Sequence, residues 1–293
     1  MTELLRLTGR VSELADGLNV RRVLPAAARR SVGPFVFFDH FGPVTLKPEV
    51  DSDVGAHPHI GLATVSFLFE GSLLHRDSLG SVQTITPGAI NWMTAGRGIV
   101  HSERVTDEER GQPRRLHGLQ LWVALPPELE ACEPAFQHVP ADDLPALVLA
   151  DEVRVRVLVG EAFGAVSPVQ AASPTLYLDV QIPPNTSWVL PPLAAEMALY
   201  SPQFSFQVDD QTVAQQEMVV LSAGSGAVLR AGAQATRLVV IGGEPLARPV
   251  RMWWNYVATD RERIAQASKR WEEGGFVSIP GETDRVEGPK WTG

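Results

Sequence analysis

Apolar and polar residues alternate over several short stretches of the chain. Alternation with a period of two is typical of β-strands that bury one face, and the glycines and prolines between the stretches supply turns. No strand-like stretch alternates with a regular helical pattern, which disfavours a parallel α/β architecture. We therefore predict an all-β protein of antiparallel sheets, arranged as a sandwich or barrel. The alternating stretches are residues 64–69, 118–125, 153–159, 175–182, 217–222 and 236–241.

One helix is predicted near the end of the chain, over residues 260–273. Thr259 is a capping residue type, and Glu262, three residues later, completes a capping box. Gly274 then provides a stop signal. The apolar residues at helical spacing are Ile264, Ala267 and Trp271. This apolar stripe is expected to cover the outside of a sheet.

The polar segment 140–145, which begins and ends with proline, separates two halves of similar strand content. We expect two domains, residues 1–140 and residues 141–293, the second including the helix and the polar tail. The halves show no residue-level repeat, yet their similar texture predicts two related barrels. Trp291 indicates that the tail docks on the fold.

Charge and cysteine content narrow the class of protein. The net charge is −9, and acidic neighbours accompany the densest basic group, Arg110, Arg114 and Arg115, so we expect no direct nucleic-acid binding. Cys132 is the only cysteine, which excludes an internal disulfide and a thiolate-built zinc site. The start lacks a secretory pattern, and no apolar run approaches the ~20 residues of a membrane span. These features predict a cytoplasmic protein.

The seven histidines all lie at or before position 138, so histidine chemistry belongs to the first half. His57 and His59, and likewise His101 and Glu103, are two residues apart and would share one face of a strand. An isolated His-x-His is commonly a surface pair, but two such pairs would aim four donors into one barrel. Imidazole and carboxylate donors suit Fe, Mn, Ni, Cu, Zn or Co, with positions left for a substrate or O₂. His75, beside an arginine and an aspartate, is expected to order a loop.

Longer motifs around these residues are specific. His57-Pro-His59 stands before an alternating stretch, and Trp92-Met-Thr-Ala-Gly-Arg-Gly-Ile-Val-His-Ser-Glu103 contains the second pair. With Phe38-Asp-His-Phe-Gly-Pro43, His117-Gly-Leu-Gln-Leu-Trp122 and Trp253-Trp-Asn255, they resemble the pirin family of the cupin superfamily. The resemblance implies a bicupin, with two antiparallel β-barrel or jelly-roll domains and metal only in the first. It implies an iron site, as Fe(II), with His57, His59, His101 and Glu103 as ligands.

The same resemblance implies an enzyme of the quercetin 2,3-dioxygenase type, acting on a flavonol-like or enolic substrate with O₂. Glu103 is then the expected catalytic base, and Gln120 is expected either to reach the metal pocket as a hydrogen-bond donor or to serve only packing and backbone bonding. Many pirins have glutamate where this chain has Ala63, so the four ligands are intact but a change in the pocket lining or in the residues behind the ligands is expected. The alternative function is an iron-dependent redox sensor that binds a protein partner, a transcription regulator or a metabolic enzyme.

Overall fold

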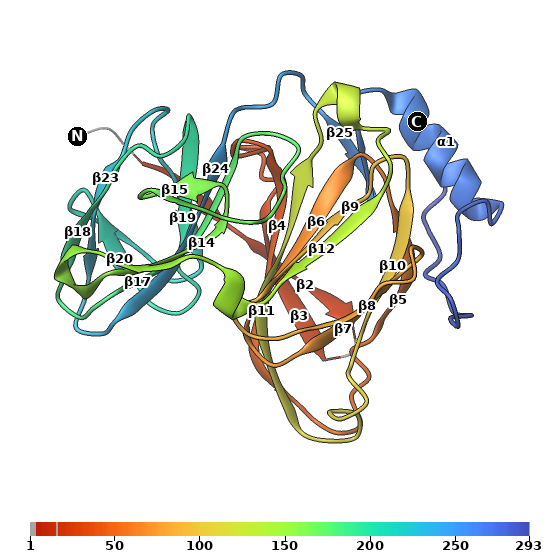
Figure 1. The fold of residues 1–293 in the computed structure, drawn as a ribbon, viewed down its shortest axis with the longest axis horizontal. Coiled ribbons are helices and arrows are strands. Elements are labelled where there is room, and N and C mark those ends of the chain that lie inside the picture. The colour runs from red at the N-terminus through yellow and green to blue at the C-terminus, as the bar shows by residue number, and fades with distance from the viewer. Residues whose placement is uncertain (1–3, 16, 293) are drawn as a thin grey trace. The chain divides into compact units, whose positions relative to one another are not determined.

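The computed structural model describes residues 4–15 and 17–292 and is built almost wholly of strands (Figure 1). It confirms the all-β prediction and the single α-helix. The chain forms two compact units that do not follow sequence order. The first, which we call the histidine unit, contains Val11–Val20, Asp39–Ala141 and the chain from Leu246 onward. The second unit contains the residues up to Arg10, Arg21–Phe38 and Asp142–Pro245.

Two sheets supply the strands of the histidine unit, although residues 21–24 of β3 and 35–38 of β4 are counted with the second unit, and their strand order brings distant segments together. In order, the seven-stranded sheet consists of β12 (Ala135–Val139), β9 (Ile90–Thr94), β6 (Leu62–Glu70), β11 (Arg114–Ala124), β4 (Phe35–Leu46), β3 (Leu18–Leu24) and β2 (Arg10–Ala15). The four-stranded sheet consists of β5 (Val54–His59), β10 (Ile99–Arg104), β7 (Leu73–Asp77) and β8 (Val82–Ile85). A hairpin follows in β25 (Arg251–Trp253) and β26 (Tyr256–Ala258), and then α1 (Arg261–Glu272).

The second unit repeats the combination of a seven-stranded and a four-stranded sheet. Its larger sheet is β1 (Leu5–Thr8), β22 (Glu217–Val220), β19 (Glu196–Tyr200), β24 (Thr236–Gly243), β17 (Thr175–Ile182), β14 (Arg154–Val159) and β13 (Ala146–Val148). Its smaller sheet is β18 (Ser187–Leu190), β23 (Ala227–Ala231), β20 (Phe206–Val208) and β21 (Gln211–Val213). The remaining elements are the hairpin β15 (Glu161–Ala162) and β16 (Ala165–Val166), and the 3-10 turns η1 (Pro127–Leu129), η2 (Ala141–Asp143) and η3 (Ala150–Glu152).

All six alternating stretches fall in strands or extend at most two residues beyond the end of one: β6, β11, β14, β17, β22 and β24. In β14 the alternation has its expected meaning, because Val155 and Val157 enter the apolar core of the second unit while Arg154 is exposed. In β6, however, both faces are buried. The small polar residues Thr64 and Ser66, which alternate with the apolar ones, are also enclosed.

Helix α1 begins and ends close to the predicted limits but has a different cap. The Glu262 N–H donates to the carboxylate of Asp260 at 2.9 Å, so Asp260 is the N-cap. Thr259 therefore does not cap the helix, and its own N–H donates to Oε1 of Glu130 at 2.7 Å. At the other end, Gly274 has a φ of +71° and donates its N–H to the Trp271 carbonyl, a turn that glycine makes without strain.

The helix and the tail lie in the histidine unit, whereas the sequence grouped them with the second half. Their apolar side chains pack with residues of β5 and β10 in one buried cluster. The amphipathic pattern indicated a covered face but carried no information on which sheet covers it. The cluster contains Ala56, Ile60, Val100, Tyr256, Ala258, Ile264, Ala267, Trp271, Phe276 and Ile279. Trp291 docks against Trp253, with ring centroids 5.2 Å apart.

Candidate metal centre

Polar side chains of β5, β10 and β7 project from one face of the four-stranded sheet. His101 of β10 lies opposite His57 of β5 and opposite Asp77 of β7, and Glu103 lies opposite His75. Directly opposed residues, and residues two apart on one strand, project from the same face of a sheet. The sequence-predicted residues His57, His101 and Glu103 therefore share this face.

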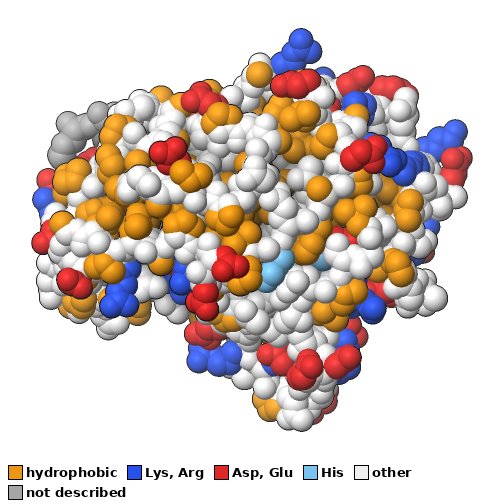
Figure 2. Space-filling view, in the orientation of Figure 1, with side chains coloured by type: hydrophobic (Ala, Val, Ile, Leu, Met, Phe, Trp, Pro, Cys, Tyr) orange, Lys and Arg blue, Asp and Glu red, His pale blue; other side chains and the backbone are white. Residues whose placement is uncertain are grey.

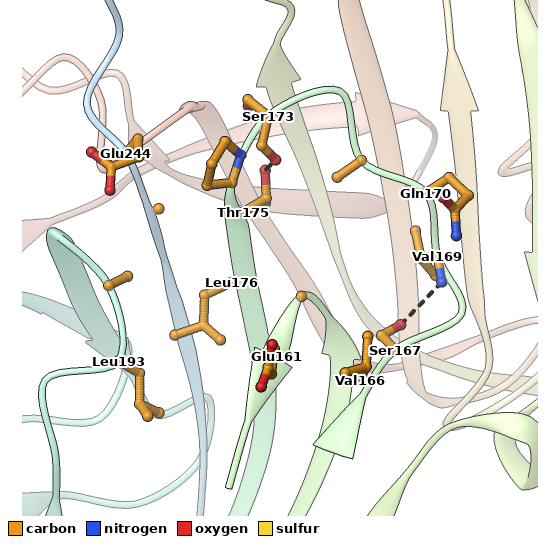
Figure 3. A pocket seen from close by; sticks show the side chains of 15 residues that line it. Glu161, Val166, Ser167, Val169, Gln170, Ser173, Thr175, Leu176, Leu193 and Glu244 are labelled. Atoms are coloured by element: carbon orange, nitrogen blue, oxygen red, sulfur yellow. Dashed lines mark hydrogen bonds between the residues drawn. The ribbon is translucent and has the colours of Figure 1, made fainter. Parts of the chain in front are cut away.

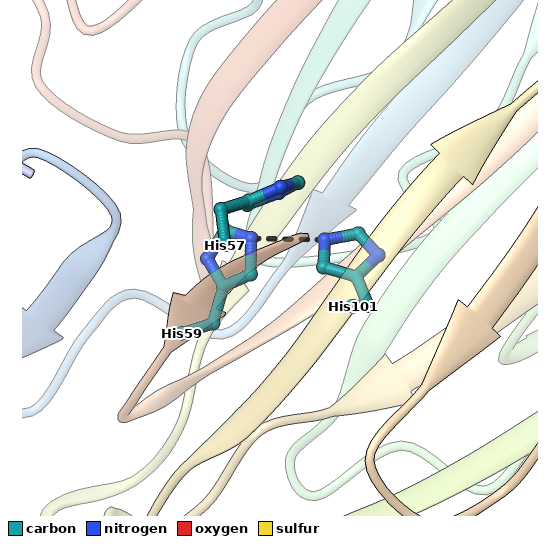
Figure 4. A group of neighbouring side chains, drawn as sticks. All are labelled: His57, His59 and His101. Carbon is teal, nitrogen blue, oxygen red and sulfur yellow. Dashed lines mark hydrogen bonds between the residues drawn. The ribbon is translucent and has the colours of Figure 1, made fainter. Parts of the chain in front are cut away.

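The imidazoles of His57, His59 and His101 converge (Figure 4). One metal-binding atom of each lies within 4.8 Å of those of the other two. Nε2 of His59 is 3.1 Å from Nε2 of His101, and the His57 and His101 ring centroids are 4.3 Å apart. All three side chains are buried. The structure thus brings together the three histidines that the two sequence pairs singled out.

Backbone carbonyls orient two of these rings. Nδ1 of His57 lies 2.8 Å from the Gly55 oxygen, and Nδ1 of His59 lies 3.0 Å from the Asn255 oxygen. Because a carbonyl oxygen only accepts, each Nδ1 carries the proton and donates it. Both rings therefore keep an unprotonated Nε2, which is the usual arrangement of a metal-binding histidine.

Burial keeps the three imidazoles neutral. It lowers the pKa of His57 from 6.5 to about 4, and the pKa values of His59 and His101 fall well below the ordinary value for the same reason. Neighbouring histidine rings lower all three pKa values further. Neutral imidazole is the form that binds metal ions, so the cluster is ready to do so near pH 7.

The spacing also fits a metal ion. Two nitrogen ligands about 2.1 Å from an ion and at right angles lie about 3 Å apart, close to the 3.1 Å between Nε2 of His59 and Nε2 of His101. Without an ion, the Nε2 of His101 must carry a proton to meet the lone pair of His59. That leaves Nδ1 of His101 as a buried acceptor, and it has no hydrogen-bond partner among the described residues. A cation between the two Nε2 atoms would accept both lone pairs, and the proton of His101 would then lie on its Nδ1.

The metal-free protein is expected to lose stability as the pH falls below 6.5. The unfolded chain protonates His57 near pH 6.5, and the folded chain only near pH 4, so the unfolded state binds more protons between these values. The contribution of His57 is complete above pH 6.5 and falls by roughly 3 kcal/mol as the pH approaches 4. Urea unfolding at pH 7.5 and 4.5 measures the loss, which should be smaller in His57→Asn. Equal losses in both proteins would contradict this prediction.

The fourth predicted ligand, Glu103, is half-buried on the same face but is not part of the group joined within 4.8 Å. Burial raises the pKa of its carboxyl above the ordinary value. Oγ of Ser66 lies 3.3 Å from Glu103 Oε1 and 2.7 Å from Gln120 Oε1. Ser66 thereby links the predicted pocket residue Gln120 to Glu103. Glu103 thus accepts a hydrogen bond on this face, and its roles as metal ligand and as base remain predictions.

Two rows of side chains cross the seven-stranded sheet in register and face the histidines. The ring of Trp122 lies 5.2 Å from that of His59, and the ring of Phe136 stacks on His75 at 4.3 Å. Ala63 projects from the opposite face of β6, so it does not line this side of the sheet, and an effect behind the ligands remains a prediction. The rows are Gln120, Ser66, Asn91 and His138, and Trp122, Thr64, Met93 and Phe136.

Sequence reasoning missed three contributors. His75 and Asp77 lie on β7 and are buried beside His101, so His75 stands in a strand and reaches the following loop through Asp77. His75 donates from Nε2 to Asp77 at 3.0 Å, and Asp77 also accepts two backbone N–H groups. The spacing of His75 and Asp77, two residues apart, was the available signal. Asn255 acts through its backbone carbonyl, which leaves no trace in the sequence.

A hollow of about 450 Å³ lies in the second unit (Figure 3). Its acidic lining residues, Glu161 and Glu244, are exposed. The hydroxyls of Ser167 and Thr175 already donate to backbone carbonyls at 2.7 and 2.9 Å. The hollow therefore lacks the convergent donors that mark the histidine cluster.

The basic group noted in the sequence is neutralised locally. Arg110 pairs with Asp53 and Arg115 with Glu70, each at 2.9 Å, while Arg114 donates to Ser52. On the face that Figure 2 shows, basic and acidic side chains are interspersed. No helix in the described part of the chain has the length and hydropathy to cross a bilayer.

Family models match both parts of the chain. The pirin model matches residues 17–123, and the model of the pirin C-terminal cupin domain matches residues 177–277. The first match contains all four predicted ligands. The second contains no histidine, in line with the prediction that the histidine cluster belongs to the first barrel.

Comparisons with individual proteins support the same family assignment. The chain is 41% identical over 260 residues to a pirin-like protein of Caulobacter vibrioides, covering 87% of this chain and 88% of that one. It is 37% identical over 288 residues to a Pseudomonas aeruginosa protein provisionally named quercetin 2,3-dioxygenase, covering 98% and 89%. The crystal structure of quercetin 2,3-dioxygenase from Acinetobacter baumannii matches with a TM-score of 0.91 at 33% identity, covering 98% and 95%. The fold is thus the predicted pair of cupin domains, and the chain belongs to the pirin family of the cupin superfamily.

Proposed function

We propose that this chain is an iron-dependent dioxygenase that cleaves flavonols of the quercetin type. The ion would be held by His57, His59 and His101, with Glu103 as the fourth ligand. The observation that carries the proposal is the convergence of three buried, neutral imidazoles beside a carboxyl whose pKa is raised. The names of the Acinetobacter and Pseudomonas relatives support the choice of substrate class.

Iron bound at this site would supply Lewis acidity toward the 3-hydroxyl of a flavonol and one-electron chemistry toward dioxygen. The overall reaction balances as one flavonol and one O₂ giving one ring-opened ester and one carbon monoxide. Carbon 3 leaves with its own oxygen, and both atoms of O₂ enter the ester. The hydroxyl proton ends on the carboxyl group of the product.

Glu103 would accept that hydroxyl proton. It would do so once its carboxylate is released from the ion, because the raised pKa that burial gives Glu103 belongs to the carboxyl group without a bound cation. Ser66, bonded to Gln120 at 2.7 Å, stands beside Glu103 and limits the orientations of its carboxyl group. This pair keeps the accepting oxygen on the side of the histidines.

An apolar row would hold the aromatic rings of the substrate. Trp122, Met93 and Phe136 lie in register on the face that looks toward the histidines. Trp122 and Met93 are buried, and the Phe136 ring is already stacked on His75. A flat substrate packed on this row displaces water from the reacting atoms, and this strengthens the electrostatic interactions at the site.

The test is turnover by untagged protein loaded anaerobically with one equivalent of Fe(II). On addition of quercetin and air, one O₂ should be consumed and one carbon monoxide released for each flavonol lost. Metal-free protein and free Fe(II) serve as controls. A rate no greater than that of free Fe(II) would overturn the proposal. Metal binding without turnover of flavonols or enediols is the outcome that the protein-partner alternative expects.

Ser66→Ala is expected to move the acid limb of the pH–rate profile to higher pH. The hydrogen bond from Ser66 stabilises the Glu103 carboxylate and lowers its pKa, so its removal raises that pKa further. The expected shift is up to about one pH unit, since the 3.3 Å contact is long. Initial rates between pH 5 and 9 measure it, and a shift to lower pH contradicts the assignment of Glu103 as base.

A further inference from the structure

The strands that carry the candidate ligands do not pair regularly. His101 of β10 lies opposite His57 of β5, but Glu103 lies opposite Val54, so two steps along β10 correspond to three along β5. The extra residue of this β-bulge falls at Gly55–Ala56. A bulge re-aims the side chains beside it and leaves backbone groups of the extra residue without partners in the ladder. Here the neighbouring side chains include His57 and Glu103.

The tail that follows α1 provides the missing partner. The Val286 N–H donates to the Ala56 carbonyl at 2.8 Å, and Arg285 forms a parallel bridge with Ala56. The Gly55 carbonyl is used by Nδ1 of His57. Both carbonyls of the bulge are therefore satisfied, one by a candidate ligand and one by the tail.

The tail contacts β5 through the backbone of Val286, and it contacts β10 through the side chain of Glu282. Its carboxylate is 6% exposed; it accepts a hydrogen bond from Ser102 Oγ at 2.7 Å and another from Arg104 Nη2 at 2.6 Å. Ser102 stands between His101 and Glu103, and Arg104 follows Glu103. Successive side chains of a strand point to opposite faces, so Ser102 and Arg104 lie on the face of β10 opposite to His101 and Glu103. Glu282 therefore contacts β10 on the face that does not carry the candidate ligands.

The tail is itself anchored. The indole N–H of Trp271 donates to the Val286 carbonyl at 3.1 Å, and the Arg285 guanidinium lies 4.0 Å over the Trp271 ring and donates to its carbonyl. Asp284 also pairs with Arg104 but is 58% exposed. Of the two tail carboxylates on Arg104, Glu282 is the one enclosed by protein.

From this arrangement we infer that Glu282 is a positioning residue for the metal centre. By fixing Ser102 and Arg104 it sets the path of β10 through the bulge, and so the direction of His101 and Glu103. The inference rests on the proposed metal site. It also gives the last part of the chain a role at a site whose ligands all lie in the first 103 residues.

The test compares wild-type protein, Glu282→Gln and Asp284→Asn, all untagged and metal-free, by titration with Co(II) alone. The Glu282→Gln change keeps the shape of the side chain but presents no charge to Arg104. Loss of an outer contact of this kind typically lowers metal affinity 10- to 100-fold, and we expect that range with a changed visible spectrum of bound Co(II). Asp284→Asn, which alters an exposed partner of the same arginine, should stay within about twofold.

Each outcome decides the matter. Unchanged affinity and spectrum in Glu282→Gln, with Co(II) bound by the wild type, overturns the inference and leaves the proposed function intact. Wild-type protein that binds no Co(II) overturns both. If Glu282→Gln fails to fold, Ser102→Ala removes only the hydroxyl contact, and an unchanged spectrum in that variant overturns the inference. If Glu282→Gln alters Co(II) binding while the wild-type protein does not turn over flavonol, the inference is upheld and the proposed function is removed.

Discussion

His101→Ala protein is expected to fold normally and to retain no metal ion. The three imidazoles converge with their lone pairs directed inward, and His101 is the ligand that meets His59 at 3.1 Å. Total binding energies of about 10–16 kcal/mol spread over four ligands give roughly 3 kcal/mol for each, so affinity should fall by about 10²–10³. Flavonol turnover should disappear with the metal. Elemental analysis of untagged protein after dialysis measures the loss.

A matched control for this variant lies in the same unit. His138 is on β12 and pairs through Nδ1 with the side-chain oxygen of Asn91 at 2.7 Å, outside the cluster of three. His138→Ala should therefore keep one metal ion per chain. Stoichiometric metal in His101→Ala, or equal loss from both variants, is incompatible with the assigned site.

Glu103→Gln protein should bind the metal more weakly, since it lacks one charged ligand, and when saturated with Fe(II) it is expected to turn over flavonol about 10²–10⁴ times more slowly, the usual contribution of a positioned base. The amide oxygen still reaches toward the site, whereas the amide cannot take the hydroxyl proton. In the wild type, activity should fall as the pH drops through the raised pKa of Glu103, because the protonated carboxyl no longer accepts a proton. That acid limb should be absent from the variant.

The measurement is kcat and KM at saturating Fe(II) across the pH range, since a base affects kcat more than KM. Glu133→Gln is the control, because Glu133 is an exposed partner of Arg97 on the surface. A Glu103→Gln enzyme with wild-type kcat and an intact acid limb would exclude Glu103 as the base.

The strands and the shared face of the histidines could be predicted because both follow from local periodicity. Val155 and Val157 point into a core, and His57 and His59 point to one side, for the same reason: a strand repeats every two residues. The pairing of β10 with both β5 and β7 is a long-range property. Sequence reasoning therefore found His101 but missed that β7 delivers His75 next to it.

The end of the chain was harder to interpret. The stripe of α1 indicated a buried face, but the cluster with Val100 and Ala56 depends on where the chain returns after the second unit. Asp260 and Thr259 are both capping residue types, and only the geometry decided between them. Asn255 contacts His59 through its backbone carbonyl, and Glu282 contacts Ser102 through its carboxylate. Neither contact produces a recognisable sequence motif.

The most direct test of the central claim is a crystal structure of the Fe(II)-loaded protein exposed to a flavonol without oxygen. It should show one ion on Nε2 of His57, His59 and His101, with Glu103 and oxygen atoms of the flavonol completing its coordination. An ion bound elsewhere, an ion wholly enclosed by protein atoms, or a flavonol bound away from the histidines would contradict the account.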